Sequence, residues 1–380
     1  MKILQVFKTY LPDTFGGVER VLHEVAEGTT ALGFENRVLS LSAKPNPGGI
    51  PIDHHWAHSA KLHFDIASTG LSFSVGKLFR QLAAKADVIH YHFPWPVMDV
   101  LQLTSSVHKP SIVTYHSDVV KQHVLLQAYY PLMHRFLGSV DKIVATSPQY
   151  IESSPVLQRY RDKTAVIPLG VTDVPPPASD LVESWRRRVG DRFFLFIGKF
   201  RYYKGIEFLL QAATATGWPV VVAGDGDARR RIEHAAPSNV TLVGAVNDAD
   251  KLALLQLCTA LVLPSHLRSE AFGVVLLEAS RASKPMITCD IGTGTSYANV
   301  DGVTGMVVPP ADVGALAGAM QTLCRNPAAA AAMGTAARQR FEYLFGAETM
   351  CKQYADVYRA IARLPRQVTS GLRYGTGSVP

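Results

Sequence analysis

Short apolar segments alternate with helix-like segments along nearly the whole chain, and the alternation starts again after three consecutive prolines. The strands predicted in the first half are residues 2–7, 36–41, 87–90, 111–115 and 142–146. The helices predicted in the same half are residues 18–32 and 75–85. Because strands that alternate with helices form parallel sheets with helices on both faces, the pattern predicts an α/β fold.

The second half repeats the pattern, which indicates a second domain. Its predicted strands are residues 193–198, 219–223, 240–243, 260–263, 285–289 and 305–308. Its predicted helices are residues 205–213, 228–235, 249–257, 272–281 and 313–323. Pro175, Pro176 and Pro177 cannot continue a helix or pair in the centre of a sheet, so they indicate a linker. A chain of 380 residues also exceeds the size at which one core usually keeps growing.

The composition favours a globular protein with full-sized cores. Hydrophobic residues make up 47% of the chain and charged residues 18%, and there is no run of eighteen apolar residues. The chain passes directly from Met1 into a strand-like segment, so no secretory signal is expected. Cys258, Cys289, Cys324 and Cys351 are too widely spaced for a metal knot or a disulfide framework, which predicts reduced core cysteines and a cytoplasmic location.

The charge balance favours an anionic partner. The chain has 38 basic and 31 acidic side chains, a formal net charge of +7, yet it has no basic recognition motif with interleaved aromatics, so nucleic acid is not expected. Phosphate fits better, in a nucleotide or at a membrane surface. Residues 120–136 mix aromatic and basic side chains, and two interpretations stay open: a helix at a membrane interface, or a helix packed on its own domain.

Two glutamates eight positions apart, Glu270 and Glu278, flank the most informative loop of the second half. Glu270 follows a predicted strand, and the apolar segment 272–281 predicts a helix after it. The amides near Phe272 and Gly273 then lie at a helix start, where unpaired N–H groups and the helix dipole suit a phosphate. The spacing alone fits two solvent-exposed glutamates on an ordinary helix equally well.

Two further loops are candidates for phosphate contact. Ligands bind beyond the carboxyl ends of strands in open parallel sheets, and Gly16 and Gly17 follow the first strand, where they let backbone amides approach a phosphate. Lys199, Arg201 and Lys204 cluster before another predicted helix start, so their charges and the helix dipole converge on one point. A structural glycine turn and a solvated basic loop are the alternatives.

Five motifs in order resemble retaining glycosyltransferase family 4 over nearly the whole chain. The Glu-x7-Glu motif, with Phe-Gly after its first Glu, is similar to the family's nucleotide-sugar motif. The other motifs are residues 6–17, 167–171, 196–205 and 292–299, of which the first and last resemble a variant found in bacterial O-antigen mannosyl- and rhamnosyltransferases. The resemblance implies the GT-B architecture, in which two Rossmann-like parallel-sheet domains face a central cleft.

The resemblance also implies a division of the chain. Residues 1–172 would form an N-terminal acceptor-binding domain, and residues 181–346 a C-terminal domain that binds the nucleotide-sugar. Residues 173–180 would link them. Residues 347–364 would form a helix that crosses back to the first domain, and residues 365–380 a flexible tail.

Roles follow for individual residues. The resemblance implies that His116, Glu270 and Lys204 are catalytic, with the imidazole of His116 hydrogen-bonded to a sugar hydroxyl and paired with Asp118 or a nearby backbone group. Glu270 would support an oxocarbenium-like transition state, and Glu278 would hold the ribose diol. The residues implied in nucleotide-sugar binding are Gly16, Gly17, Lys199, Arg201, Lys204, Glu270, Phe272, Gly273, Val274 and Glu278. Since the family usually has Arg where Lys199 stands, it stays open whether Arg201 supplies the bidentate phosphate contact.

No obligatory metal and no cofactor are expected. Eleven of the thirteen histidines lie at or before His134, but they are spread over several loops without a consistent ligand set. The simpler interpretation is surface and cleft histidines, with His90 and His92 lining the acceptor side. Two Asp-x-Asp sequences match the metal-diphosphate signature of a different glycosyltransferase fold, but each lies where a loop enters a helix, so Asp227 and Asp248 are predicted helix caps.

The function implied by the resemblance is transfer of a hexose with retention of anomeric configuration. The donor would be GDP-mannose or GDP-rhamnose, and the acceptor a lipid-linked oligosaccharide of lipopolysaccharide O-antigen assembly. The enzyme would work in the cytoplasm, with peripheral contact at the inner face of the cytoplasmic membrane. Three alternatives stay open: a family 4 transferase that uses a UDP-sugar, a GT-B-fold nucleotide-sugar 2-epimerase, and a non-catalytic nucleotide-binding scaffold.

Overall fold

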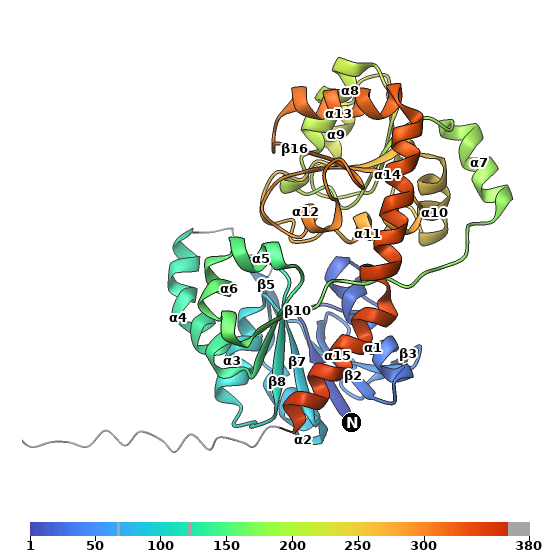
Figure 1. Ribbon diagram of the computed structural model, residues 1–380. Coiled ribbons are helices and arrows are strands. Elements are labelled where there is room, and N and C mark those ends of the chain that lie inside the picture. Colours follow the sequence, from blue (N-terminus) through green and yellow to red (C-terminus); the bar gives the residue numbers. More distant parts are fainter. Residues whose placement is uncertain (67–68, 120–122, 364–380) are drawn as a thin grey trace, which may run out of the picture.

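The protein has an α/β fold with two parallel-sheet, Rossmann-like domains, as the sequence predicted (Figure 1). The computed structural model describes residues 1–66, 69–119 and 123–363. The predicted tail at 365–380 lies outside the described residues.

The N-terminal domain is built on an eight-stranded sheet in the order β10-β9-β8-β7-β1-β2-β4-β3, parallel except for the pair β3 and β4. The sheet strands are β1 (Lys2–Val6), β2 (Glu35–Ser42), β3 (Ile50–Ile52), β4 (His55–Lys61), β7 (Val88–Phe93), β8 (Ser111–Tyr115), β9 (Lys142–Ala145) and β10 (Thr164–Val166). The hairpin strands are β5 (Phe64–Ile66) and β6 (Thr69–Leu71). Every residue of β7 and β8 is buried, which is typical of central strands covered on both faces.

Helices cover both faces of this sheet. They are α1 (Gly17–Ala31), α2 (Val75–Lys85), α3 (Pro96–Thr104), α4 (His123–Ser139), α5 (Pro148–Ser153), α6 (Pro155–Arg159) and the short η1 (Arg161–Lys163). In α4, Met133, Phe136 and Leu137 are buried in the domain core, which supports the packed interpretation for this part of the segment 120–136. Residues 120–122 of that segment lie outside the described residues.

The C-terminal domain has a six-stranded, fully parallel sheet in the order β13-β12-β11-β14-β15-β16. Its strands are β11 (Phe194–Ile197), β12 (Val220–Ala223), β13 (Val240–Gly244), β14 (Ala260–Leu263), β15 (Met286–Cys289) and β16 (Gly305–Val308). Its helices are α7 (Ser179–Val189), η2 (Tyr202–Lys204), α8 (Ile206–Thr216), α9 (Arg229–Ala235), α10 (Asp248–Leu257), α11 (Val274–Arg281), α12 (Thr295–Ala298), α13 (Val313–Arg325) and α14 (Pro327–Arg340).

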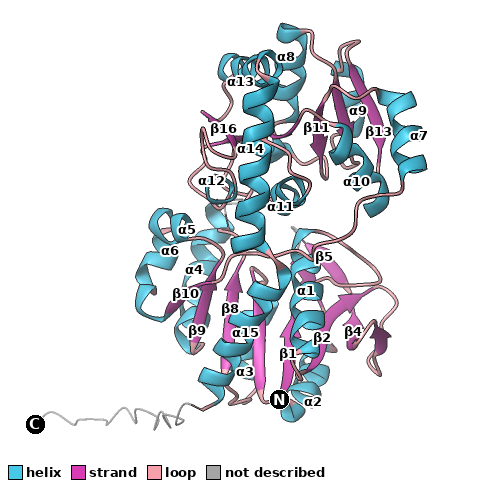
Figure 2. Cartoon of the chain, turned by 45° about the vertical axis from the view of Figure 1, so that its right-hand side comes forward, coloured by secondary structure: helices cyan, strands magenta, loops and turns pink. Residues whose placement is uncertain are grey.

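The chain returns to the N-terminal domain at its end. The π-helical segment η3 (Phe341–Phe345) leads into α15 (Ala347–Ala362), which packs against α1 and lies across the N-terminal sheet in Figure 2. Tyr354 and Tyr358 of α15 are fully buried there. The two domains are therefore joined twice, once through the segment before α7 and once through α15.

Several strands and helices were not predicted from the sequence, for physical reasons. The strands β3, β5 and β6 are too short, at 3 residues each, to show an alternation of hydrophobicity, and β4 has polar side chains at most of its positions. Helix α14 is rich in alanine, which favours a helix but gives no apolar periodicity. Helix α7 begins at Ser179, within the segment 173–180 that was predicted as a linker.

Two expectations concern the chain as a whole. All four cysteines are free thiols, and Cys258, Cys289 and Cys351 are buried, as predicted for core residues. No helix in the described ranges is long and apolar enough to cross a membrane.

Candidate active site

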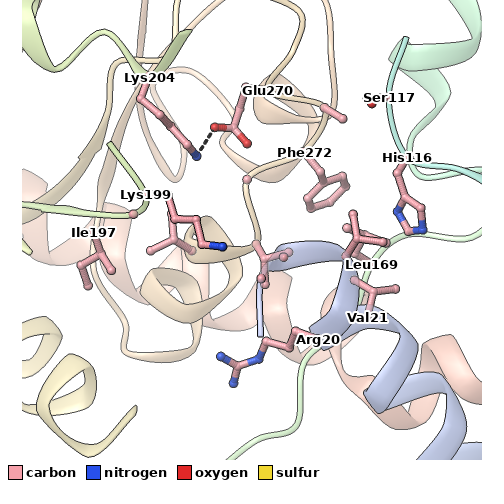
Figure 3. A pocket seen from close by; sticks show the side chains of 18 of the residues that line it. Arg20, Val21, His116, Ser117, Leu169, Ile197, Lys199, Lys204, Glu270 and Phe272 are labelled. Carbon is pink, nitrogen blue, oxygen red and sulfur yellow. Dashed lines mark hydrogen bonds and ion pairs between the residues drawn. The ribbon is translucent and has the colours of Figure 1, made fainter. Parts of the chain in front are cut away.

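A cavity of about 460 Å³ lies between the two domains, beyond the carboxyl ends of strands from both sheets. His116 follows β8 on the N-terminal side, and Lys199 and Glu270 follow β11 and β14 on the C-terminal side. Figure 3 shows these side chains around the cavity. Lys204 and Glu278, both expected to bind the nucleotide-sugar, line this cavity. The volume is within the usual range of ligand sites.

Two helix starts meet at this cavity. Gly17 opens α1, and a Cβ added to it would lie 3.8 Å from Cγ2 of Val274, the first residue of α11. Gly273 has a φ of +82°, and a Cβ there would lie 2.6 Å from Leu263 Cδ2, so this position requires glycine. Helix α11 thus begins two residues later than predicted. Two helix dipoles with unpaired amides favour an anion between them.

Glu270 and Lys204 form a nearly buried ion pair at the cavity wall. Lys204 Nζ donates to Glu270 Oε2, and the Ser265 hydroxyl donates to the same oxygen at 2.9 Å. The side chains of Lys204 and Glu270 are 12% and 9% exposed. Burial by itself would lower the pKa of Lys204, but the Glu270 carboxylate, with Tyr203, outweighs it and raises that pKa. Lys204 therefore keeps a full positive charge in the cavity.

Glu278 binds two cations that the sequence analysis did not single out. Its Oε1 accepts from Arg20 Nη1 at 2.5 Å and from Lys251 Nζ at 2.9 Å, and its side chain is 5% exposed. Arg20 belongs to α1, so this contact joins the two domains. The sequence contains only a weak signal for these two residues. Arg20 is one turn beyond the Gly16-Gly17 pair, and Lys251 is one turn into the helix that begins at Asp248.

The predicted cluster of three cations is divided in the structure. Lys199 and Lys204 line the cavity, whereas Arg201 is not among the residues that line it. The Arg201 guanidinium donates to Asp227 at 3.0 Å, and its side chain is 48% exposed. The short helix η2 begins directly after Arg201 and turns Lys204 toward the cavity instead.

His116 lines the cavity and is held by another histidine. Its Nε2 lies 2.9 Å from Nδ1 of His92, and burial lowers the pKa of His116 to about 3, so its imidazole is neutral. The expected partner Asp118 is engaged elsewhere. Its carboxylate accepts from Tyr115 and Ser154 and pairs with Arg268 of the C-terminal domain at 2.9 Å.

The prediction that His90 and His92 line the acceptor side was wrong. Both side chains are fully buried, and neither lines the cavity. They lie on β7, a central strand between β1 and β8, and Tyr354 and Tyr358 of α15 cover it. The sequence did not show that a helix from the far end of the chain covers this strand.

The predicted helix caps were also wrong. Asn247, not Asp248, caps α10, because its side chain accepts from the amide of Asp250 at 2.8 Å. Helix α9 begins at Arg229, so Asp227 precedes its N-cap residue and pairs with Arg201.

Among the described residues, His23, Glu27 and Asp53 form a group with ligand atoms within 4.8 Å of one another. None of these three residues lines the cavity. Their side chains already form histidine–carboxylate contacts, His23 with Asp53 and Glu27 with His54 and His55.

Comparison with known proteins shows the family. The model for "Glycosyltransferase Family 4" matches residues 15–173, and the model for "Glycosyl transferases group 1" matches residues 179–340. The chain is 50% identical over 353 residues to D-rhamnosyltransferase WbpZ of Pseudomonas aeruginosa, covering 91% of this chain and 93% of that protein. The chain belongs to glycosyltransferase family 4. It is also 46% identical over 367 residues to O-antigen chain mannosyltransferase C of Escherichia coli, covering 95% and 99% of the two chains.

Solved structures show the fold. Sucrose-phosphate synthase of Thermosynechococcus elongatus superposes with a TM-score of 0.80 at 22% identity, covering 95% of this chain and 98% of that chain. Anabaena Alr3699/HepE, solved in complex with UDP-glucose, superposes with a TM-score of 0.76 at 17% identity, covering 95% and 100%. This family 4 protein therefore has the predicted GT-B fold, and it is a hexosyltransferase.

Proposed function

We propose that this enzyme transfers mannose or D-rhamnose from a GDP-sugar to a lipid-linked saccharide of O-antigen assembly, with retention of anomeric configuration. The likeness to a D-rhamnosyltransferase and an O-antigen mannosyltransferase, each over more than nine-tenths of the chain, supports the sugar and the pathway. The observation that carries the transferase chemistry is the convergence of Lys199, Lys204 and two helix starts on one cavity.

The cations and helix starts would bind the donor diphosphate. As the glycosidic bond breaks, the diphosphate gains negative charge, and preorganised positive groups stabilise that charge without reorganising. Lys199 and Lys204 face the cavity and fit this role better than Arg201, which is paired with Asp227. Glu270 would accept hydrogen bonds from hydroxyls of the transferred sugar.

Glu278 would bind the ribose diol of the donor. It lines the cavity close to the start of α11, but its Oε1 already accepts from Arg20 and Lys251. A ribose that donates to Glu278 would take over part of these contacts. Because Arg20 belongs to the N-terminal domain, donor binding would then loosen one of the contacts between the domains.

Retention would arise from attack on the face from which the diphosphate leaves. The acceptor oxygen bonds to the anomeric carbon while the bond to the diphosphate oxygen breaks, and the hydroxyl proton passes to the departing phosphate. A double displacement needs a carboxylate on the opposite face of the sugar. Among the described residues that line the cavity, the carboxylates are Glu270 and Glu278, both on the C-terminal side. Proton NMR of the product tests this proposal: an inverted anomer would contradict it.

We propose that turnover needs no divalent metal and no cofactor. Asp225, Asp227, Asp248 and Asp250, the Asp-x-Asp residues, bind Arg229, Arg201, Lys251 and Trp185 respectively and do not line the cavity. Full activity in EDTA is expected. Loss of activity in EDTA with recovery in Mn²⁺ or Mg²⁺ would contradict the proposal.

Thermal shift identifies the donor. A ligand that binds only the folded state raises its melting temperature, so GDP and its sugars should stabilise the protein more than UDP and its sugars at equal concentration. The reverse ranking would favour the alternative, a family 4 transferase that uses a UDP-sugar. Glycosylated product from a lipid-linked acceptor excludes a 2-epimerase, which would need no acceptor.

Peripheral contact with the inner face of the cytoplasmic membrane would bring the enzyme to such an acceptor. The net charge of +7 supports attraction to anionic lipid, and exposed apolar side chains on and beside the β5–β6 hairpin support insertion: Phe64 is 55%, Ile66 61% and Phe73 82% exposed. Sedimentation with vesicles of anionic phospholipid tests this contact, with neutral vesicles as the control. Equal recovery with both kinds of vesicle, or with neither, would contradict it.

A further inference from the structure

The histidines behind the cavity form a hydrogen-bonded column with Gln5. His92 Nδ1 lies 2.9 Å from His116 Nε2, and His92 Nε2 lies 3.0 Å from Gln5 Oε1. Gln5 and His92 are fully buried, so they reach a ligand only through His116, which lines the cavity. The rings of His92 and His116 are stacked, with centroids 5.2 Å apart and an interplanar angle of 13°. The column connects the centre of the sheet with the cavity.

The column continues on its other side to the helix that returns from the C-terminal domain. The ring of His90 lies against that of His92, with centroids 4.1 Å apart and an interplanar angle of 30°. Its two nitrogens lie 2.7 Å from the hydroxyls of Tyr358 and Thr114. Since His90 and His92 lie on β7, with α15 closing the column behind them, the rings are fixed by the core and not by a loop. Such support is what a precisely oriented functional group requires.

Gln5 selects one arrangement of protons in this column. An amide oxygen only accepts hydrogen bonds, so Gln5 Oε1 requires a proton on Nε2 of His92. Burial lowers the pKa of His92 well below its usual value and that of His116 to about 3, so both rings are neutral. Neutral His92 then has an unprotonated Nδ1, which accepts the Nε2–H of His116.

The remaining nitrogen of His116 is therefore an acceptor. His116 Nδ1 has no hydrogen-bond partner among the described residues. It is nevertheless absent from the fully buried polar atoms that lack a partner, so this nitrogen is not fully buried. Because His116 lines the cavity, Nδ1 is the ring nitrogen open to a ligand. A hydroxyl of the sugar or of the acceptor is a donor that it can bind.

On the basis of the proposed transferase function, we propose that Gln5 and His92 are positioning residues that hold His116 in its Nε2-protonated tautomer. His116 then offers Nδ1 as a hydrogen-bond acceptor to a hydroxyl of the reacting sugar or acceptor. The tautomer matters because the opposite one would present an N–H at this point, and a hydroxyl that must donate would lose its partner.

Replacement of His92 by phenylalanine tests the role of its nitrogens. His92→Phe keeps an aromatic ring for the stack but removes the acceptor for the His116 Nε2–H. We expect kcat to fall roughly 10- to 100-fold, by analogy with groups that orient a metal-ligating histidine. The dissociation constant of GDP should stay unchanged, because His92 does not line the cavity.

Two further variants separate positioning from a packing defect. His92→Gln restores an amide oxygen that can accept from His116 and should recover most of the lost kcat. His58→Phe is the matched control, since His58 is a buried histidine on β4, bonded to Pro47 O and outside the column, and it should leave kcat unchanged. Equal losses of kcat and GDP affinity in His92→Phe, or no recovery in His92→Gln, would overturn the proposal.

Nitrogen-15 NMR of the histidine side chains tests the tautomer without any assay of activity. In the wild-type protein we expect His116 protonated on Nε2, and in His92→Phe a mixture of both tautomers. A wild-type His116 protonated on Nδ1 would overturn the assignment. If the protein transferred no sugar at all, the proposed function would fail, while this measurement would still decide the tautomer.

Discussion

The two walls of the cleft differ in charge. The charged residues that line the C-terminal wall are Lys199, Lys204, Lys251, Glu270 and Glu278. Among the residues described on the N-terminal wall, Arg20 is charged, and the neutral His116 and the glycines Gly16 and Gly17 lie beside it. Within the part of the chain that the structure describes, each charged group of the C-terminal wall except Lys199 has an ion-pair partner.

This difference separates two tasks. The C-terminal wall is suited to a diphosphate whose charge grows during the reaction, because its cations are fixed before the donor binds. The N-terminal wall is suited to neutral hydroxyls. For these, the tautomer and the orientation of the His116 ring matter more than a charge. Removing charges from the first wall should therefore have larger effects than disturbing the second.

The largest effect is expected for Glu270→Gln. The amide keeps the shape but loses the negative charge that would support the oxocarbenium-like transition state, so kcat should fall roughly 1,000-fold with little change in GDP affinity. Steady-state kinetics and calorimetry with GDP measure the two quantities. Because Lys204 would be left buried without its carboxylate, the double variant with Lys204→Met is the control for stability: it should fold well and stay inactive. An active Glu270→Gln enzyme would remove this assignment.

The second-largest loss of kcat is expected for Lys204→Met. Loss of one preorganised cation at a developing charge typically costs about 3 kcal/mol, so kcat should fall roughly 100-fold. Lys204→Arg keeps the charge and should retain more activity than the methionine variant. If both variants were equally inactive, the position would depend on packing and not on charge.

The buried histidines of the N-terminal domain make stability depend on pH. The pKa of His116 is lowered to about 3, and burial lowers those of His90 and His92 well below 6.5. At these three histidines the unfolded chain therefore binds more protons than the folded protein below about pH 6.5, so their contribution to stability is full above that pH and falls as the pH decreases. His116 should contribute about 1.4 kcal/mol per pH unit between pH 6 and 4, and His90 and His92 should add to the slope in the same direction.

Urea unfolding between pH 4 and 8 measures this slope. His58→Phe removes a histidine outside the column whose pKa is also lowered by burial, and it should leave most of the slope in place. His92→Phe should reduce the slope more. A stability that did not change between pH 4 and 6 would contradict the neutral column.

Glu278→Ala should weaken nucleotide binding about tenfold, the equivalent of ~1.4 kcal/mol, with a smaller effect on kcat. The ribose diol would lose its acceptor, and Arg20 and Lys251 would lose theirs. Calorimetry with GDP measures the change, and Glu278→Gln, which keeps an oxygen acceptor, is the matched control. Unchanged nucleotide affinity in Glu278→Ala would rule out the ribose role.

Arg201→Ala should have the smallest effect, less than about threefold in kcat, because an exposed ion pair contributes little. Lys199→Ala in the same loop should be clearly worse, since Lys199 lines the cavity. The opposite ranking would assign the phosphate contact to Arg201 after all.

Both carboxylates and two of the three lysines of the C-terminal wall were predictable because local signals identify them. Lys199, Lys204 and Glu270 lie in the segments that follow predicted strands, Glu278 lies in the helix after Glu270, and parallel strands end at the same edge of a sheet. Such a signal gives the position of a residue along the chain and not the direction of its side chain. For this reason the same loop also suggested Arg201, which turns away to Asp227.

The partners of these residues were not predictable. Arg20 pairs with Glu278 across 258 positions of sequence, and Arg268 pairs with Asp118 across 150. Neither pair has a spacing or pattern of its own, because each depends on how the two domains face each other. The same limit explains why His90 and His92, at a strand end, were expected in the cleft.

The sequence by itself determined the two α/β domains, the order of their motifs, and Glu270, Glu278, Lys199 and Lys204 of the C-terminal wall. These features follow from hydrophobic periodicity, helix starts and strand ends, which act over a few residues. The tertiary structure alone decided which cations face the cavity and that Arg20 forms an ion pair with Glu278. It also decided that α15 buries the histidine column behind His116. Contacts of this kind depend on domain packing, and local propensity carries no information about it.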